Sequence, residues 1–373
     1  MPHAHELTLT VGGRIWRGWK SVSVTRSVEA LAGSFSLGLL DRWSEEMLPL
    51  PLAPDMDCCV EIGGDPVITG AIDEVRAELS AQGRAFTVSG RDSTAELVDC
   101  SAVHQPGEWS GLDLLSLAQR LAELFGVRVF NLAPRGEKFP VCKIQPGETA
   151  HEVLERHCRQ RGVLCTSDTS GNLVLAMPGA AVCSEALVEG DNVLSATAQY
   201  SRRERFSEYL VRGQSQGADD NFGEAVAHVS AAATDPGIAR FRPLLITAEG
   251  QSDKLSARER AHWEATVRAA RAARCTVTVQ GWRQRTGHGE LWPVNAVVPV
   301  RIPSVRLEAD MLISRVQYSL SASGSVTELE LVRPDAFARE QDFRTLAPSL
   351  AAGADPTPVA ETTHDCGAEV YGR

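Results

Sequence analysis

The most specific chemical motif in the chain is a Gly-x-Ser-x-Gly pattern at 213–217. It places Ser215 where many serine hydrolases carry their nucleophile. That nucleophile needs a strand before it and a packed helix after it, so that the hydroxyl stands on a strained turn. A strand pattern precedes the motif at 209–211, but polar and glycine residues follow it. We expect a polar loop here, and an esterase acting through Ser215 is kept only as an alternative.

Metal ligation is a second chemistry that these residue types permit. His151, His157, Cys158 and Cys165 are close in sequence. On a helix, however, the two histidines are about 240° apart and face different sides. The segment HEVLE lacks the second histidine of the zinc-protease motif, because Glu155 stands at that position. We expect no metal site, and the two cysteines are typical of small buried apolar side chains.

Other catalytic patterns are weaker still. The chain has no phosphate-binding Gly-Lys loop and no G-x-G-x-x-G fingerprint. The adjacent carboxylates Glu45-Glu46 and Asp219-Asp220 lie in predicted loops, where paired acids are usually solvated charge. We therefore predict a protein that is not an enzyme and that binds no cofactor.

Composition sets the broad class. The 373 residues are 43% hydrophobic and 23% charged, which is ordinary for two or three globular domains. The net charge of −11 argues against nucleic-acid binding as the main role. Nine irregularly spaced cysteines argue against a disulfide framework. With no long apolar run and no basic, apolar start, we expect no transmembrane segment, no secretion signal, and folding in a cytoplasm.

The first hundred residues predict an all-β domain. Apolar and polar residues alternate at 7–11, 21–24, 59–62 and 85–88, with glycine turns between them. Short strands at this spacing are typical of a barrel or sandwich. We place this first β-barrel-like domain at 1–100.

Residues 101–190 change to a small α/β domain. Ser110 and Thr149 each begin a capping box, and an apolar helical face follows both. A hairpin pattern at 163–175 completes the unit. Strand patterns return in 191–345, where we expect a second β-barrel-like domain with one helix at about 253–273. The Pro-, Ala- and Thr-rich end, 346–373, predicts a disordered tail. The fold class is α+β, mainly β.

Arginine and tryptophan mark candidate contact surfaces. Only four of the 37 basic residues are lysines, and Arg and Trp are favoured at protein interfaces. We predict interface roles for five residues, and core packing stays open for the indoles: Trp263, Arg268, Trp282, Arg283 and Trp292.

Two hairpin patterns resemble each other. Both 67–92 and 311–335 contain a strand, a glycine-containing polar turn, a second strand and then Arg and Asp. If they come from a duplication, the two β domains share one strand order. A different order, or one continuous sheet, would show that the duplication hypothesis is wrong.

Six ordered segments resemble the Mu-type baseplate hub proteins of contractile phage tails. They are GRDSTAELVDCS (90–101), QPGETAHEVLERHCRQRGVLCTSDTSGNLVLA (145–176), RRERFSEYLVRGQS (202–215), RPLLITAEGQSD (242–253), RCTVTVQGWRQRTGHGELWPVN (274–295) and MLISRVQYSLSASGSVTELELVRPDAF (311–337).

This resemblance implies a structural subunit of the virion tail baseplate, assembled in the host cytoplasm. It implies a homotrimeric ring whose two barrels per chain give six similar units. Such a ring would adapt a sixfold tail tube, or a distal tube protein, to a threefold central spike, beside other baseplate proteins. We further expect the two barrels to superpose by roughly 60° about the trimer axis, with the α/β domain off the ring.

A glycan-binding tail module is the remaining alternative. Residues 146–149, followed by a helix, look like the start of a LysM repeat, which binds peptidoglycan. A LysM unit continues into a second helix, whereas a hairpin pattern around Gly171 follows here.

Overall fold

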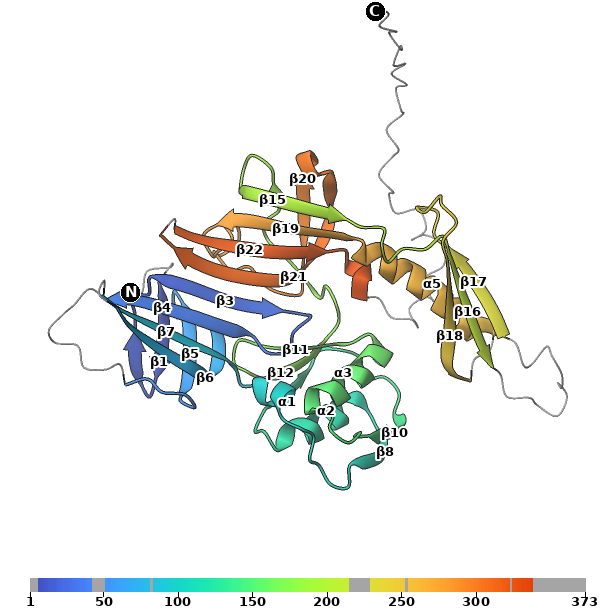
Figure 1. Ribbon diagram of the computed structural model, residues 1–373, viewed down its shortest axis with the longest axis horizontal. Coiled ribbons are helices and arrows are strands. Elements are labelled where there is room, and N and C mark those ends of the chain that lie inside the picture. The colour runs from blue at the N-terminus through green and yellow to red at the C-terminus, as the bar shows by residue number, and fades with distance from the viewer. Residues whose placement is uncertain are drawn as a thin grey trace, which may run out of the picture.

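The computed structural model describes residues 6–41, 51–80, 83–214, 229–251, 254–322 and 324–337. Within them lie a large curved sheet, a small α/β unit below it, and an outlying sheet joined by a long helix (Figure 1). The predictions for Ser215 and for a disordered tail at 346–373 fall outside the described residues.

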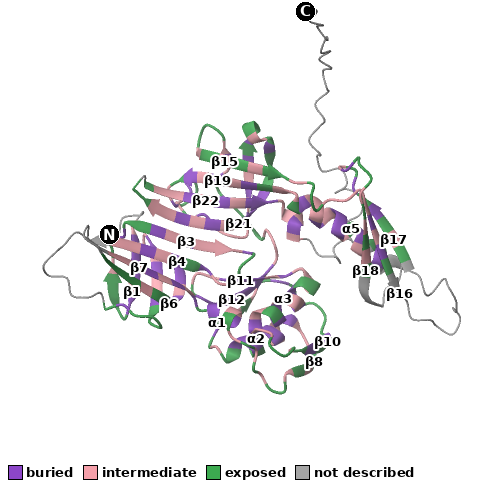
Figure 2. Ribbon diagram, in the orientation of Figure 1, coloured by how far each residue is buried: buried purple, intermediate pink, exposed green. Residues whose placement is uncertain are grey.

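The first β region forms because apolar residues alternate along each strand and point to one face. Leu9, Val24 and Leu37 are buried on that face, with polar neighbours between them (Figure 2). The strands are β1 (Leu7–Val11), β2 (Arg14–Trp16), β3 (Ser21–Ser27), β4 (Ser34–Asp41), β5 (Asp57–Ile62), β6 (Asp65–Ser80) and β7 (Gly83–Asp92).

The second β region follows the same alternation, with Val277, Val316 and Leu329 buried. Two short strands from the preceding connection, β13 (Ala181–Val182) and β14 (Leu187–Val188), pair with its strand β20. The main strands are β15 (Val193–Tyr200), β19 (Ala273–Gln280), β20 (Ala296–Ile302), β21 (Leu307–Ser321) and β22 (Gly324–Val332).

The two β regions join into one 14-stranded sheet, because β3 pairs antiparallel with β21. These strands lie side by side across the middle of the molecule (Figure 1). Buried side chains of both regions, Val24 and Val316 among them, belong to a single hydrophobic cluster. The mainly β fold class is confirmed, whereas two separate sheets are not what forms.

The α/β unit packs three helices against two small sheets around a second core containing Leu117, Leu121 and Leu154. Its elements are α1 (Ala95–Asp99), β8 (Glu108–Leu112), α2 (Leu114–Glu123), β9 (Val129–Asn131), β10 (Phe139–Lys143), α3 (Ala150–Arg161), β11 (Leu164–Ser167) and β12 (Leu173–Ala176).

The two predicted helix caps differ in outcome. Thr149 and Glu152 form the predicted capping box of α3. The predicted cap at Ser110 is wrong: Asp113 caps α2 by accepting from the Ser116 backbone N–H. Ser110 pairs with Val141 in the β8–β10 hairpin, and this strand pairing takes precedence over the local capping pattern.

Asp92 fixes the α/β unit to the first β region. Its buried carboxylate accepts hydrogen bonds from the Gly33 backbone N–H at 2.7 Å and the Ser167 hydroxyl at 2.6 Å. The Thr94 backbone N–H and hydroxyl donate to its other oxygen. Because a buried carboxylate is costly unless fully hydrogen-bonded, this junction holds the unit in one orientation.

The outlying sheet has strand order β17-β16-β18 and packs on the predicted helix, now α5. Ala257 and Ala261 of α5 are buried against Tyr209, since small side chains let the helix approach the strands closely. The bounds are β16 (Glu208–Gln214), β17 (Val229–Thr234), β18 (Pro243–Gln251) and α5 (Lys254–Arg271); short 3-10 turns are η1 (Pro303–Val305) and η2 (Pro334–Phe337).

Across the residues that the structure describes, no helix has the length and apolarity needed to cross a membrane.

Candidate assembly interface

The strand order of the large sheet repeats itself. The first β region has the order β3-β4-β7-β6-β5, and the second has β15-β19-β22-β21-β20. All four neighbouring pairs are antiparallel in both regions. The predicted common strand order is therefore confirmed. The two separate sheets that the duplication hypothesis required are not found, because the two regions form one continuous sheet, and on that criterion the duplication hypothesis is wrong.

The register of the two hairpins is also the same. In β6–β7, Ile72 pairs with Gly90 and Ser80 with Gly83. Adding 241 to these residue numbers gives the pairs of β21–β22: Ile313 pairs with Leu331, and Ser321 pairs with Gly324. Each hairpin has its β-bulge at the same step, at Asp73 in one and Ser314 in the other. Bulges are specific structural features, so two unrelated hairpins would not be expected to share a bulge position.

The agreement extends to the flanking strands. Ser34 pairs with Arg91 as Arg274 pairs with Val332. Strand β4 is therefore equivalent to β19, with residue numbers 240 apart. The β15–β19 pairing has the same register as the β3–β4 pairing. Thr25 pairs with Ser34 as Gln199 pairs with Arg274, so Thr25 corresponds to Gln199. We call the two five-stranded units repeat 1 and repeat 2.

One local contact repeats where β3 and β15 end. The Ser27 hydroxyl oxygen accepts from the Glu29 backbone N–H at 3.0 Å. At the equivalent place, the Ser201 hydroxyl oxygen accepts from the Arg203 backbone N–H at 3.3 Å. Both strands therefore end in the same turn, and the continuous sheet results from edge pairing of two repeats.

The repeats differ beyond their fifth strand. In repeat 1, β1 runs antiparallel to β5, whereas β13 and β14 run parallel to β20 in repeat 2. The chain enters the two units from different directions, which accounts for this difference.

The pairing of β3 with β21 is called the seam. It runs from Arg315–Ser27 to Leu320–Val22. Across it, the Gln317 side-chain amide donates to the Ser23 hydroxyl at 3.0 Å. The Ser314 carbonyl at the bulge accepts from the Val28 backbone N–H at 2.8 Å and from the Ser27 hydroxyl at 3.1 Å.

Two edges of the large sheet are relevant to assembly, and neither has a strand partner within the described part of the chain. One is the outer edge of β15, where Leu194 and Tyr200 are each 56% exposed. The other is the part of β6 beyond its pairing with β5, from Glu74 to Leu79, with Leu79 72% exposed; we call it the β6 edge. An open edge presents unpaired backbone groups that are ready to pair with another chain.

The predicted interface residues have varied surroundings. Trp282 and Trp292 are buried in the large core, the alternative that the sequence left open for them. Trp263 on α5 is half-buried beneath the guanidinium of Arg260 at 4.6 Å. Arg268 contacts Glu264, at 2.8 Å, on the same helix.

Arg283 connects the two β regions. Its guanidinium donates to the Ile62 carbonyl at 2.8 Å and contacts the Asp65 carboxylate at 2.6 Å, both at the turn between β5 and β6. It also donates to the Gly289 carbonyl within its own loop. Contacts of Trp263, Arg268 and Arg283 with another subunit stay predictions.

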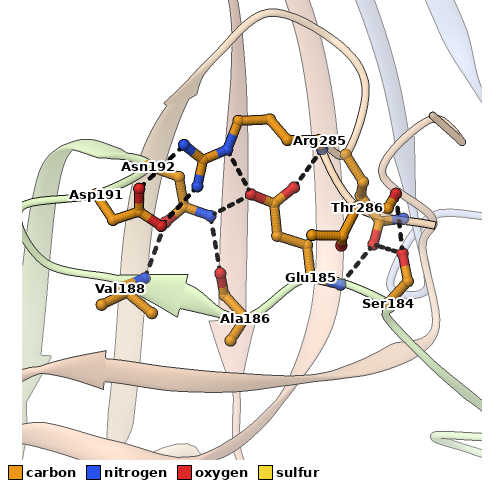
Figure 3. A network of polar contacts seen from close by, with 9 residues as sticks. Ser184, Glu185, Ala186, Val188, Asp191, Asn192, Arg285 and Thr286 are labelled. Carbon is orange, nitrogen blue, oxygen red and sulfur yellow. Dashed lines mark hydrogen bonds and ion pairs between the residues drawn. The ribbon is translucent and has the colours of Figure 1, made fainter.

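A polar network that no sequence pattern predicted holds the loop between β19 and β20. Figure 3 shows Arg285 reaching Glu185 on one side and Asp191 on the other. Asn192 donates to Glu185 at 2.9 Å. Burial acts to raise the pKa of Glu185, but hydrogen bonds from Arg285 and Asn192 outweigh it and hold the pKa below its usual value.

The residues considered for metal binding serve the core of the α/β unit. His157 is buried, and its Nδ1 lies 2.7 Å from the Val153 carbonyl of its own helix. Cys158 and Cys165 are buried and unpaired. No grouping of three metal-binding side chains occurs among the described residues.

Family models match three stretches of the chain. Residues 6–92 match the N-terminal part of Mu phage baseplate assembly protein GpP-like, and 94–177 match the second domain of baseplate hub protein gp44-like. Residues 253–340 match the fourth domain of Mu phage baseplate assembly protein GpP.

Whole-chain relatives agree with these models. Baseplate hub protein gp44 of Escherichia phage Mu is 34% identical over 343 residues, 90% of this chain and 89% of that protein. The 43 kDa tail protein of prophage MuSo2 from Shewanella oneidensis superposes with a TM-score of 0.81 at 35% identity, covering 89% of this chain and 99% of that one. A tail protein from Neisseria meningitidis MC58 gives 0.72 at 25% identity, covering 90% and 99%.

Proposed function

This chain belongs to the family of Mu-phage baseplate hub proteins, and from that premise we propose that three copies close into a ring at the centre of a tail baseplate. The ring contains six repeats, two from each chain, and joins a sixfold tail tube to a threefold central spike. The observation that carries this proposal is the shared strand order and register of repeat 1 and repeat 2.

The repeats supply a way to match the two symmetries. A threefold ring presents only three equivalent positions to a sixfold partner. Because each chain carries two units with one strand order, three chains present six similar surfaces. The proposal requires the repeats to be related by roughly 60° about the ring axis, so that closure repeats the same contacts.

The parts outside the repeats are proposed to lie off the ring. The α/β unit, for which 101–190 was the predicted range, hangs from one side of the large sheet (Figure 1). Nothing in repeat 2 corresponds to it. It and the outlying sheet with α5 are the surfaces left for other baseplate proteins, with Trp263 and Arg268 as proposed contacts.

We propose a structural role without catalysis, in a protein assembled in the host cytoplasm and carried in the virion tail. The name of the Mu relative, a baseplate hub protein, supports this role. A LysM-like peptidoglycan-binding role has weaker support, because α3 is followed by the β11–β12 hairpin, where a LysM repeat would have its second helix.

Removal of the gene tests the proposal in a phage that carries it. Electron microscopy of lysates should show no complete tails, and supplying the chain in trans should restore them. Complete tails that contain tube, spike and baseplate without this chain would contradict a hub role.

A further inference from the structure

The seam shows how one repeat joins another. It pairs the first strand of repeat 1, β3, with the long strand of repeat 2, β21. By the register above, β15 is the repeat 2 equivalent of β3, and β6 is the repeat 1 equivalent of β21. The outer edge of β15 and the β6 edge therefore correspond to the two strands that pair in the seam.

We propose that β15 of one copy pairs antiparallel with the β6 edge of the next copy, in the register of the seam. This inference rests on the proposed ring and names the contact that closes it. Transferring the seam pairs through the two repeats gives the expected partners, one from each copy: Glu74–Ser201, Val75–Tyr200, Arg76–Gln199, Ala77–Ala198, Glu78–Thr197 and Leu79–Ala196.

In this register, apolar side chains of the two strands lie on one face of the sheet and polar side chains lie on the other. Val75 of β6 and Ala196 of β15 already pack against the core. Because side chains alternate along a strand, Leu79 lies on the same face as Val75, and Ala198 lies on the same face as Ala196. In the seam, Val24 and Val316 occupy that face and are buried. Pairing would therefore cover the exposed Leu79 side chain with the apolar side chains of the neighbouring copy.

The opposite face is compatible in charge. The β6 edge presents Glu74, Arg76 and Glu78 there, and the proposed partners on β15 are Ser, Thr and Gln. No like charges meet, and hydroxyl and amide groups can accept or donate to the charged neighbours. The seam has the same character, with the Gln317–Ser23 hydrogen bond across it.

The end of β15 has the residue and the turn needed to repeat the contact that Ser27 makes with the Ser314 carbonyl. Ser27 donates its hydroxyl to the Ser314 carbonyl at the seam bulge, while its oxygen accepts from Glu29. Ser201 makes the matching turn, and Asp73 holds the matching bulge on β6. The expected contact is from the Ser201 hydroxyl to the Asp73 carbonyl of the next copy.

β15 also lacks the sequence features that normally protect an edge; its contact with a neighbouring turn is made by the Tyr200 hydroxyl, which donates to the Val305 and Arg306 carbonyls at η1. Its sequence, VLSATAQY, has no charged residue and no proline. Exposed edge strands usually carry a Lys, a Pro or a covering element because they otherwise associate. The contact is heterologous, since different surfaces of the two copies meet, and such contacts form a ring when the rotation closes.

Cysteine cross-linking in the full chain tests the register. We combine Ala77→Cys with Ala198→Cys, because directly opposite residues on antiparallel strands have Cα atoms about 4.5–5.5 Å apart, within disulfide range. Mild oxidation should convert most chains into covalent dimers and trimers on a non-reducing gel. The unmodified protein gives the background from its native cysteines.

Two controls fix the interpretation. Ala77→Cys with Gln199→Cys shifts the register by one residue, which puts the thiols on opposite faces, and should stay at background. Ser23→Cys with Ser319→Cys lies in the seam and should cross-link within one chain. Because the core-face variant could disturb folding, Glu78→Cys with Thr197→Cys repeats the test on the polar face.

Light scattering on the reduced samples separates the two proposals. A trimer that cross-links at 77–198 and 78–197 but not at 77–199 is the expected result. A trimer without these cross-links, or with 77–199 preferred, would overturn the strand pairing and leave the ring intact. A monomer, or a cross-link confined to one chain, would overturn both.

Discussion

The guanidinium of Arg283 lies 2.6 Å from the carboxylate of Asp65, and this contact ties the loop after β19 to the turn between β5 and β6. The Arg283 side chain is 16% exposed and Asp65 59%. The same guanidinium donates to the Ile62 carbonyl, so the contact continues into the backbone of the first β region. The Arg283 contact therefore holds the first and second β regions together at a place other than the seam.

Arg283→Ala is expected to lower the free energy of unfolding by about 1–3 kcal/mol, because it leaves the Ile62 and Gly289 carbonyls without a charged donor. Asp65→Asn should cost less than about 1 kcal/mol, since the carboxylate is largely exposed. Urea denaturation followed by tryptophan fluorescence measures both. Equal losses for the two variants would show that the ion pair, and not the carbonyl contacts, accounts for the stability.

Glu185→Gln is expected to destabilise the fold by about 1–3 kcal/mol at neutral pH, because Arg285 then faces a neutral amide. The pKa of Glu185 is lower in the folded state than its usual value. Its contribution is therefore present above the pKa of the unfolded chain, roughly 4.3, and is lost as pH falls through the lower folded value.

Urea denaturation of both proteins at a series of pH values checks this dependence. The difference in unfolding free energy should shrink as pH falls below about 4. Asp191→Asn is the matched control: Asp191 and Arg285 are both more than half exposed, so its effect should be much smaller than that of Glu185→Gln. A difference that stays constant to pH 3 would contradict the assigned role of the Glu185 carboxylate.

Trp282→Ala is expected to cost about 3–5 kcal/mol, because the indole is fully buried and its removal leaves a large cavity. The Ser319 carbonyl also loses its donor, the indole N–H, which lies 3.0 Å away in the unmodified protein. Thermal unfolding measures the loss. Trp263→Ala on the half-buried face of α5 should cost much less, and similar losses for both would contradict the different burial of the two indoles.

Much of this fold is local and could be predicted. The strand alternation, the helix at 253–273 and the Thr149 capping box each depend on a few neighbouring residues. The β11–β12 hairpin also follows from its turn. What failed was non-local: Ser110 has a capping pattern, yet its pairing with Val141 decides its structure.

The repeat was only partly visible for the same reason. The sequence showed the two hairpins, but the corresponding segments 21–27 and 195–201 share only two serine positions, Ser21 with Ser195 and Ser27 with Ser201. Their equivalence lies in backbone pairing, which many sequences satisfy. The seam, Asp92 and Glu185 join segments far apart in sequence, and no local pattern marks such contacts.

Ser215→Ala is expected to leave phage infectivity unchanged and the free energy of unfolding within about 0.5 kcal/mol, the usual result in a polar loop such as the sequence predicts here. The reason is the sequence after the motif, which has no helix pattern to hold a nucleophile in place. Plaque counts and urea denaturation provide the two measurements. Loss of infectivity in a stably folded variant would revive the esterase alternative.

The mass of the purified chain in solution tests the ring most directly. One chain has a mass of 40.2 kDa, and we expect a particle of three chains by light scattering at micromolar concentration. Addition of tube or spike protein should leave that number of hub chains unchanged. A particle that stays a single chain, alone and with those partners present, would contradict the proposed ring.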